Sequence, residues 1–377
     1  MLHFIQDNFI GYTCHESRLG VVGSVAKLRS FCWLLLCLSW TNVCGAAVVP
    51  WLYDVEVPVE NQSSSARHEA SKVALLQVLT RLTGLVHVPR YPQIVRALSA
   101  PDLYYSQFRF VAGPASVTNN GVGTPFSLRI QFEPRSVLRL IRDSALPIWG
   151  SNRPLVVAWV VVEQGIEREI IATGSTHPLA LALQQRAEER GLPILYPLLD
   201  LEDQIKVDPA VVWGRMSQVL LPASERYGAD IVLVGRIQAL GEGSWATSWE
   251  FWWDGLIIPL ERRDVAATLS AAAVVDLIVD ELTQRYAVLG REPRQILLGV
   301  SGVASPADYG NLLNYLEALE FVDGVNVAQI NADHLGLIVT TRAEPEQLQW
   351  LLEVERRLLQ PTDPGFSSAD IEMVWGG

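Results

Sequence analysis

The segment Ser244–Gly255, SWATSWEFWWDG, places four tryptophans just before the dipeptide Asp254-Gly255. An Asp-Gly pair between two apolar runs is the strongest short-range hairpin signal, because a type I′ turn needs a positive φ at both central positions. The segment therefore predicts a β-hairpin with strands over residues 245–253 and 256–261. A chain with such a hairpin must contain a sheet with a large aromatic face.

Side chains alternate between the two faces of a strand, which divides the aromatic residues of this hairpin into two groups. The face that holds most of them is predicted to pack into the core, through Trp245, Trp249, Phe251 and Trp253. The opposite face is mostly small or polar and is expected to meet solvent. Trp252 and Glu250 lie there, and they are the two candidate residues for a ligand-binding surface. Core packing is favoured over a ring-lined ligand platform, because aromatic residues at strand period generally pack.

An export signal is predicted near the amino terminus. Lys27 and Arg29 precede an apolar run over residues 31–40, and small residues follow at 45–47. This order is typical of a secretory signal peptide, and we expect cleavage after Ala46 or Ala47. The run is too short for an ordinary membrane span, which needs about 20 apolar residues. Residues 1–47 are therefore assigned to an upstream segment and a signal peptide, and the mature protein is expected in the periplasm.

Composition narrows the range of partners. All four cysteines, Cys14, Cys32, Cys37 and Cys44, precede the predicted cleavage site, so the mature chain would hold neither a disulfide nor a cysteine-bound metal. The formal net charge of −12 repels phosphate backbones, which makes nucleic acid an unexpected partner. No later segment approaches 18 consecutive apolar residues, so the mature chain is expected to lack a membrane span.

The remainder reads as an α/β (α+β) chain of three small modules with mixed sheets, over residues 48–150, 151–290 and 295–360. In the first module, strands are expected at 52–59, 107–113 and 126–132, with helices at 66–84 and 134–149. The third repeats this β-α-β-β-α order, with strands at 295–302, 325–330 and 335–341 and helices at 305–324 and 344–359. Residues 361–377 are expected to form a loosely held tail.

The middle module is expected to hold a partly parallel sheet, because its strands alternate with helices. The run over residues 154–163 is continuously apolar, as a central strand covered on both faces must be. A second buried strand is expected at 230–238, before the tryptophan-rich hairpin. A long amphipathic helix at 269–290 follows the hairpin.

The sequence holds only weak short motifs for catalysis or for metal and phosphate binding. The histidines of the mature chain, His68, His87, His177 and His334, do not form a local pair for a metal, and His177 and His334 are expected to be surface residues. Neither a phosphate-binding glycine loop nor a GxSxG nucleophile motif is present. Residues 200–203, DLED, form the best carboxylate cluster. A cation site or an acid–base pair is one interpretation, but a loop with a helix N-cap is favoured. No catalytic, cofactor-binding or metal-binding residue is therefore assigned.

Five segments carry a resemblance to a known family. They are residues 52–84, 152–163, 196–203, 223–237 and 279–288. In this order they resemble an uncharacterised family of proteobacterial envelope proteins, domain of unknown function 2066. The modules are more loosely similar to the amino-terminal domain of TolB, to curli-secretion lipoproteins and to flagellar assembly protein T. These resemblances imply modules that bind other proteins without catalysis, and they transfer no functional residue.

The sequence thus predicts a non-catalytic periplasmic protein that binds envelope proteins or assists their assembly. The β-α-β-β-α modules would offer sheet edges and helix faces to a protein partner. Binding of peptidoglycan or another glycan through exposed aromatic rings is the first alternative. A hydrolase whose catalytic residues are distant in sequence is the second, and it would require a histidine brought to the carboxylates of 200–203.

Overall fold

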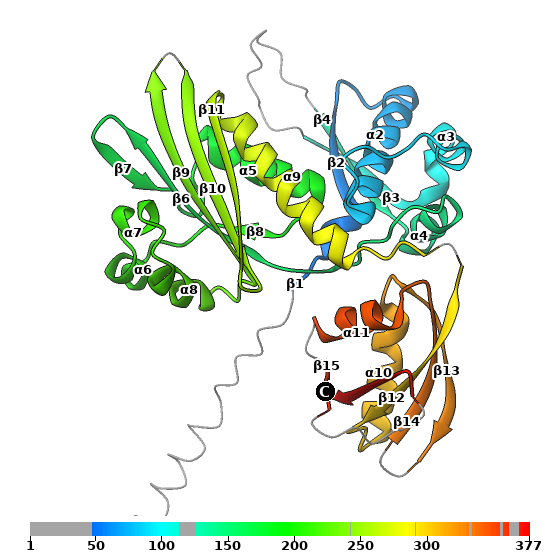
Figure 1. Ribbon diagram of the computed structural model, residues 1–377. Helices are drawn as coiled ribbons and strands as arrows, with labels where there is room; N and C mark the ends of the chain where they lie inside the picture. The colour runs from blue at the N-terminus through cyan, green and yellow to red at the C-terminus, as the bar shows by residue number, and fades with distance from the viewer. Residues whose placement is uncertain are drawn as a thin grey trace, which may run out of the picture. The chain divides into compact units, whose positions relative to one another are not determined.

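The computed structural model describes residues 47–112, 126–241, 243–290, 292–331, 334–354, 357–361 and 369–377. The predicted signal peptide lies outside these ranges except for Ala47. The described residues belong to one compact unit. The fold is α/β with three mixed or antiparallel sheets in addition to one short strand pair, which confirms the predicted fold class (Figure 1). Within the described ranges, no helix has both the length and the apolar character that a membrane crossing requires.

The first sheet is antiparallel with strand order β2-β4-β3. Its strands are β2 (Asp54–Val59), β3 (Tyr105–Ala112) and β4 (Phe126–Phe132). The helices that share its core are α2 (Ser64–Thr83), α3 (Pro92–Ser99) and α4 (Pro134–Asp143), together with the short η1 (Pro50–Tyr53) and η2 (Pro101–Tyr104). The predicted β-α-β-β-α order is present, and α3 and η2 are additions to it between α2 and β3.

The ends of α2 are set by local chemistry. The Ser63 hydroxyl accepts a hydrogen bond from the Ala66 N–H, which caps the amino end. Gly84 ends the helix with a φ of 68°, a conformation that glycine adopts without steric cost.

The second sheet has strand order β11-β10-β9-β6-β7, with β8 also paired to β6. Its strands are β6 (Val156–Gln164), β7 (Glu167–Ile170), β8 (Ile194–Leu195), β9 (Ile231–Gly241), β10 (Ser244–Trp253) and β11 (Leu256–Val265). Strands β8 and β9 run parallel to β6, and the other pairs are antiparallel. The predicted partly parallel sheet and its tryptophan-rich hairpin, β10–β11, are both present.

Helices cover both faces of this sheet. On one face lie α5 (Pro178–Arg190) and α9 (Ala267–Tyr286), which enclose a large core with β6, β9 and β10. On the other lie the short helices α6 (Leu201–Lys206), α7 (Pro209–Trp213) and α8 (Ser217–Glu225) (Figure 1). Side chains of α7 and α8 build the second core with the opposite face of β6, β9 and β10. Because both faces are covered, β6 is buried from Val156 to Val162.

The third sheet has strand order β13-β14-β12-β16-β15. Its elements are β12 (Arg294–Ser301), α10 (Pro306–Ala318), β13 (Val322–Ile330), β14 (His334–Thr341), α11 (Pro345–Glu353), β15 (Leu358–Leu359) and β16 (Ile371–Trp375). Ser305 caps α10 in a reciprocal pair of hydrogen bonds with Asp308.

The prediction of a loose tail over 361–377 is wrong for β16. This strand runs parallel to β12 and antiparallel to β15. Ile371, Met373 and Trp375 alternate onto the core of the third sheet, and all three are buried. Burial of these apolar side chains holds the strand in the sheet.

Buried arginines connect the first sheet to the second. The short strands β1 (Ala47–Val48) and β5 (Asn152–Arg153) pair nearby. The Arg153 side chain is fully buried and donates to the backbone oxygens of Arg81 (2.7 Å) and Gly191 (2.6 Å). It also donates to the oxygens of Trp149 and Gly150 and lies over the Trp149 ring. Burial lowers the pKa of the Arg153 guanidinium to about 9.

Two further arginines serve the same junction. Arg81 donates to the backbone oxygens of Glu188 and Asp54, both at 2.8 Å. Arg190, at the end of α5, donates to the Gly84 oxygen (2.9 Å) and to the carboxylate of Asp280 on α9 (2.8 Å). The carboxyl ends of α2 and α5 therefore meet at guanidinium groups, which satisfy carbonyls that a helix end leaves unpaired.

Candidate functional site

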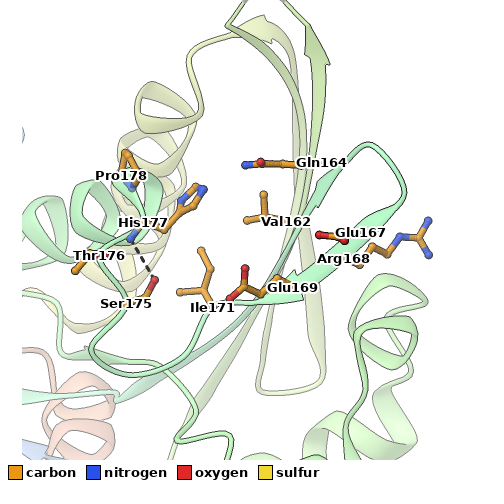
Figure 2. Close-up of a pocket in the computed structure, with 10 residues that line it drawn as sticks. All are labelled: Val162, Gln164, Glu167, Arg168, Glu169, Ile171, Ser175, Thr176, His177 and Pro178. Carbon is orange, nitrogen blue, oxygen red and sulfur yellow. Dashed lines mark hydrogen bonds between the residues drawn. The ribbon is translucent and has the colours of Figure 1, made fainter.

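A cleft of about 780 Å³ lies between the β6–β7 hairpin and the start of α5 (Figure 2). The hairpin turns at Gly165, whose φ is 68°, and its tip exposes Ile166 completely. Glu167 pairs with Gln164 and Glu169 pairs with Val162 across the two strands. Because paired residues share a face, these four side chains point to the α5 side of the sheet.

The cleft combines an apolar floor with a polar rim. Val162 and Ile171 form the floor and belong to the core beneath α5 and α9. Gln164, Glu167 and Glu169 line the hairpin wall. Residues 175–178 form the opposite wall at the start of α5 (Figure 2). A ligand here would contact apolar surface below and hydrogen-bonding groups on both sides.

His177 is the N-cap residue of α5. Its Nδ1 accepts the Leu179 N–H at 3.2 Å, and its backbone N–H donates to the Ser175 Oγ, also at 3.2 Å. With Nδ1 accepting, the proton of the neutral imidazole sits on Nε2. The ring therefore has one nitrogen left to meet a ligand at the start of α5.

The carboxylates of the hairpin wall have no cationic partner in the described part of the chain. Neither Glu167 nor Glu169 forms an ion pair there. Arg168, between them, points to the opposite face, where it pairs with Glu163 at 2.6 Å and lies 4.0 Å from the Trp213 ring centre (Figure 2). The hairpin wall, to which Arg168 also belongs, therefore presents the two carboxylates of Glu167 and Glu169 without a cationic partner among the described residues.

The polar groups at the start of α5 are occupied by hydrogen bonds to the backbone. A serine nucleophile needs a base within hydrogen-bond reach of its hydroxyl. The Ser175 Oγ accepts the His177 backbone N–H and the His177 Nδ1 accepts the Leu179 N–H, so neither bond joins the hydroxyl to the imidazole. Over the described ranges, no group of three or more His, Cys, Asp or Glu side chains is placed to hold a metal ion.

The predicted aromatic core residues lie on the α5–α9 side of the second sheet. Trp249 and Phe251 are completely buried, Trp253 is 9% exposed, and Trp245 packs against them while partly buried. The Trp249 Nε1 donates to the Ser270 Oγ at 2.9 Å, so its polar atom is satisfied.

The expectation that Trp252 meets solvent is wrong, since its side chain is 6% exposed. It packs in the second core, because α7 and α8 cover the face that the strand pattern assigns to solvent. Its Nε1 donates to the Glu250 Oε2 at 3.1 Å, and Glu250 also forms an ion pair with Arg215. Neither candidate residue therefore offers an open surface to a ligand.

The carboxylates of 200–203 form a structural network. Asp200 caps α6 by accepting the Asp203 N–H at 3.1 Å, which is the favoured interpretation of this segment. Arg226 pairs with Asp200 at 2.8 Å and holds the pKa of that carboxyl well below its usual range. Burial, with the Asp203 carboxylate beside it, raises the pKa of Tyr227 to about 12. The hairpin cleft brings His177 to Glu167 and Glu169, and not to these aspartates.

Comparison with known families matches residues 46–150 to a domain of unknown function, DUF8605. This corrects the resemblance to domain of unknown function 2066, because DUF8605 is a different domain. No curated protein matches the chain. The hairpin cleft lies wholly outside the matched residues, so the match carries no information about it.

Proposed function

We propose that this chain is a non-catalytic periplasmic protein that binds a basic segment of another envelope protein in the hairpin cleft. The observation that supports this most is the combination of an apolar floor, Val162 and Ile171, with the carboxylates of Glu167 and Glu169, which form no ion pair among the described residues. Binding of this kind would bring envelope proteins together and assist their assembly.

A lysine or arginine side chain has the chemistry that this cleft complements. Its methylene stem is apolar and its head is a cation. The stem would lie on Val162 and Ile171, and the head would reach the carboxylates of Glu167 and Glu169. The exposed Ile166 at the hairpin tip would add an apolar contact beside the cleft. The net charge of −12 would speed the encounter with a basic partner.

The proposal that the protein is exported rests on the sequence near the amino terminus. The order of basic, apolar and small residues over 27–47 supports secretion, and the lack of cysteine after Cys44 suits an oxidising compartment. Removing residues 27–47 should retain the protein in the cytoplasm of a Gram-negative host. Osmotic-shock fractionation would show this, and release of the truncated protein with the periplasm would refute the export proposal.

Site-specific photo-crosslinking in cells tests the binding proposal. A photoreactive residue at Ile166 should capture one dominant envelope protein, whereas one at Leu103, exposed on η2, should not. The double substitution Glu167→Lys and Glu169→Lys should abolish that capture, because it places two cations where the partner's cation would sit. Glu225→Lys, at an exposed site on α8, controls for charge alone. Equal capture by both charge variants would reject the hairpin cleft as the binding site.

A further inference from the structure

A second cleft, of about 510 Å³, lies beside α10 and β16. Asn311 and Asn314, exposed on α10, line one wall. Asn152, in β5, also lines this cleft, together with Tyr315 and Trp375. This cleft shares no residue with the hairpin cleft.

Two donors of this lining lack acceptors in the described part of the chain. The Nδ2 of Asn152 and the Nε1 of Trp375 are buried and make no hydrogen bond there. Buried donors without partners are rare and destabilising, and each calls for an explanation. The Arg357 guanidinium also lines the cleft, 5.4 Å from the Tyr315 ring centre. The lining therefore favours a ligand that is rich in acceptor oxygens.

The asparagines narrow the class of ligand. A carboxamide offers two N–H donors and one acceptor oxygen, which match the C=O and N–H groups of a peptide backbone. Asn311 and Asn314 are three residues apart, so they stand on one face of α10. An extended segment laid along that face would meet both carboxamides in turn.

A saccharide fits less well. Saccharide recognition generally uses an aromatic ring face open to the sugar. Tyr315 is 8% exposed and Trp375 6% exposed as whole residues, so neither presents an open ring face. We propose that the cleft beside α10 binds an extended polypeptide segment through its backbone groups. Because the contacts are to the backbone, binding tolerates many sequences.

Fluorescence anisotropy with the full chain tests this proposal. The probe is a labelled, uncharged and unstructured peptide of alternating Thr and Ser. Asn311→Ala with Asn314→Ala should weaken binding by about tenfold or more, since two carboxamides lose their hydrogen bonds. Alanine is a strong helix former, so α10 itself should persist. Asn326→Ala, at an exposed position on β13, is the matched control and should bind normally.

Two further measurements separate this proposal from the hairpin-cleft proposal and from saccharide binding. The hairpin variant Glu167→Lys with Glu169→Lys should bind this peptide normally, so failure of one proposal leaves the other intact. The indole N–H resonance of Trp375, identified by its loss in Trp375→Phe, should shift on addition of the peptide. No binding by the wild-type chain, or equal binding by the double asparagine variant, would overturn the proposal. An indole shift with an N-acetylglucosamine oligosaccharide and none with the peptide would also overturn it.

Discussion

Gly235 and Trp249 are directly opposite each other in the paired strands β9 and β10, so the size of one side chain limits the size of the other. A Cβ atom on Gly235 would lie 2.5 Å from the Trp249 Cζ3 atom. The indole is fully buried and held by its hydrogen bond to Ser270, so it has little room to move. Glycine at 235 is therefore part of how this sheet accommodates a tryptophan.

We expect Gly235→Ala to lower the free energy of unfolding by about 1–3 kcal/mol, as overpacked cores do. Gly310→Ala, in the interior of α10, should instead raise it by about 0.5–1 kcal/mol, because alanine is the better helix former. A Cβ there would meet no atom within 4 Å. Urea unfolding followed by circular dichroism measures both. Equal effects of the two substitutions would contradict the packing argument.

The ionisation of Asp200 makes the stability of the folded chain depend on pH in the acid range. Its hydrogen bonds to Arg226 and to the Asp203 N–H lower the pKa of this carboxyl in the folded chain. The unfolded chain then binds more protons as the pH falls below about 4, so the contribution of Asp200 is lost in that range.

Asp200→Asn keeps a good N-cap but removes the titration. The substitution should therefore reduce the loss of stability between neutral pH and pH about 3. Urea midpoints at the two pH values check this, with Asp208→Asn, the N-cap of α7, as the control. An unchanged difference between the two midpoints would show that Asp200 does not set the acid dependence.

For single residues, a local sequence pattern predicts some features of the environment and misses others. Strand alternation places Trp249 and Phe251 on one face and Trp252 on the other, and the structure has them so. Alternation does not show whether the second face is covered, because the covering helices α7 and α8 come from residues 209–225, well before the hairpin. The same limit applies to the hairpin cleft, since only the fold brings Glu167 and Glu169 opposite His177.

At the scale of elements, most helices and strands follow from local signals. The Asp-Gly turn produces the hairpin expected of it, and local caps at Ser63 and Ser305 begin α2 and α10. Strand β16 is the exception. Five residues with alternating apolar side chains do not reveal a partner, and β12 lies some 70 residues earlier in the chain. Parallel pairing needs a long connection, so no local motif marks it.

Removing residues 369–377 should destabilise the third sheet, because three buried side chains worth about 1.5–3 kcal/mol each are lost. The edge of β12 that pairs with β16 would become open to water. Amide hydrogen exchange should therefore rise over β12, and removal of Gly377 alone should leave it unchanged. Native-like protection of β12 in the longer truncation would show that β16 is dispensable.

At the scale of the whole molecule, Arg153 makes the first and second sheets depend on each other. Replacing it with methionine leaves buried carbonyl oxygens of both parts without donors. We expect Arg153→Met to lower the free energy of unfolding by at least about 3 kcal/mol. Calorimetry should show a lower midpoint of thermal unfolding for Arg153→Met. Arg139→Met, at an exposed position on α4, should change this midpoint little. Similar midpoints for the two variants would mean that the buried guanidinium contributes no more than a surface one.

The position of Arg153 also bears on how this chain can be divided. The family match ends at residue 150, three residues before the side chain that binds the backbone oxygens of Arg81, Trp149 and Gly150. A recombinant fragment cut at the family boundary would therefore lack a piece of its own interior. A fragment extended to Arg153 would regain that guanidinium. The guanidinium also donates to the Gly191 oxygen, which lies among the residues of the second sheet and would still be missing. Homology boundaries and physical boundaries differ here, and expression trials should follow the physical one.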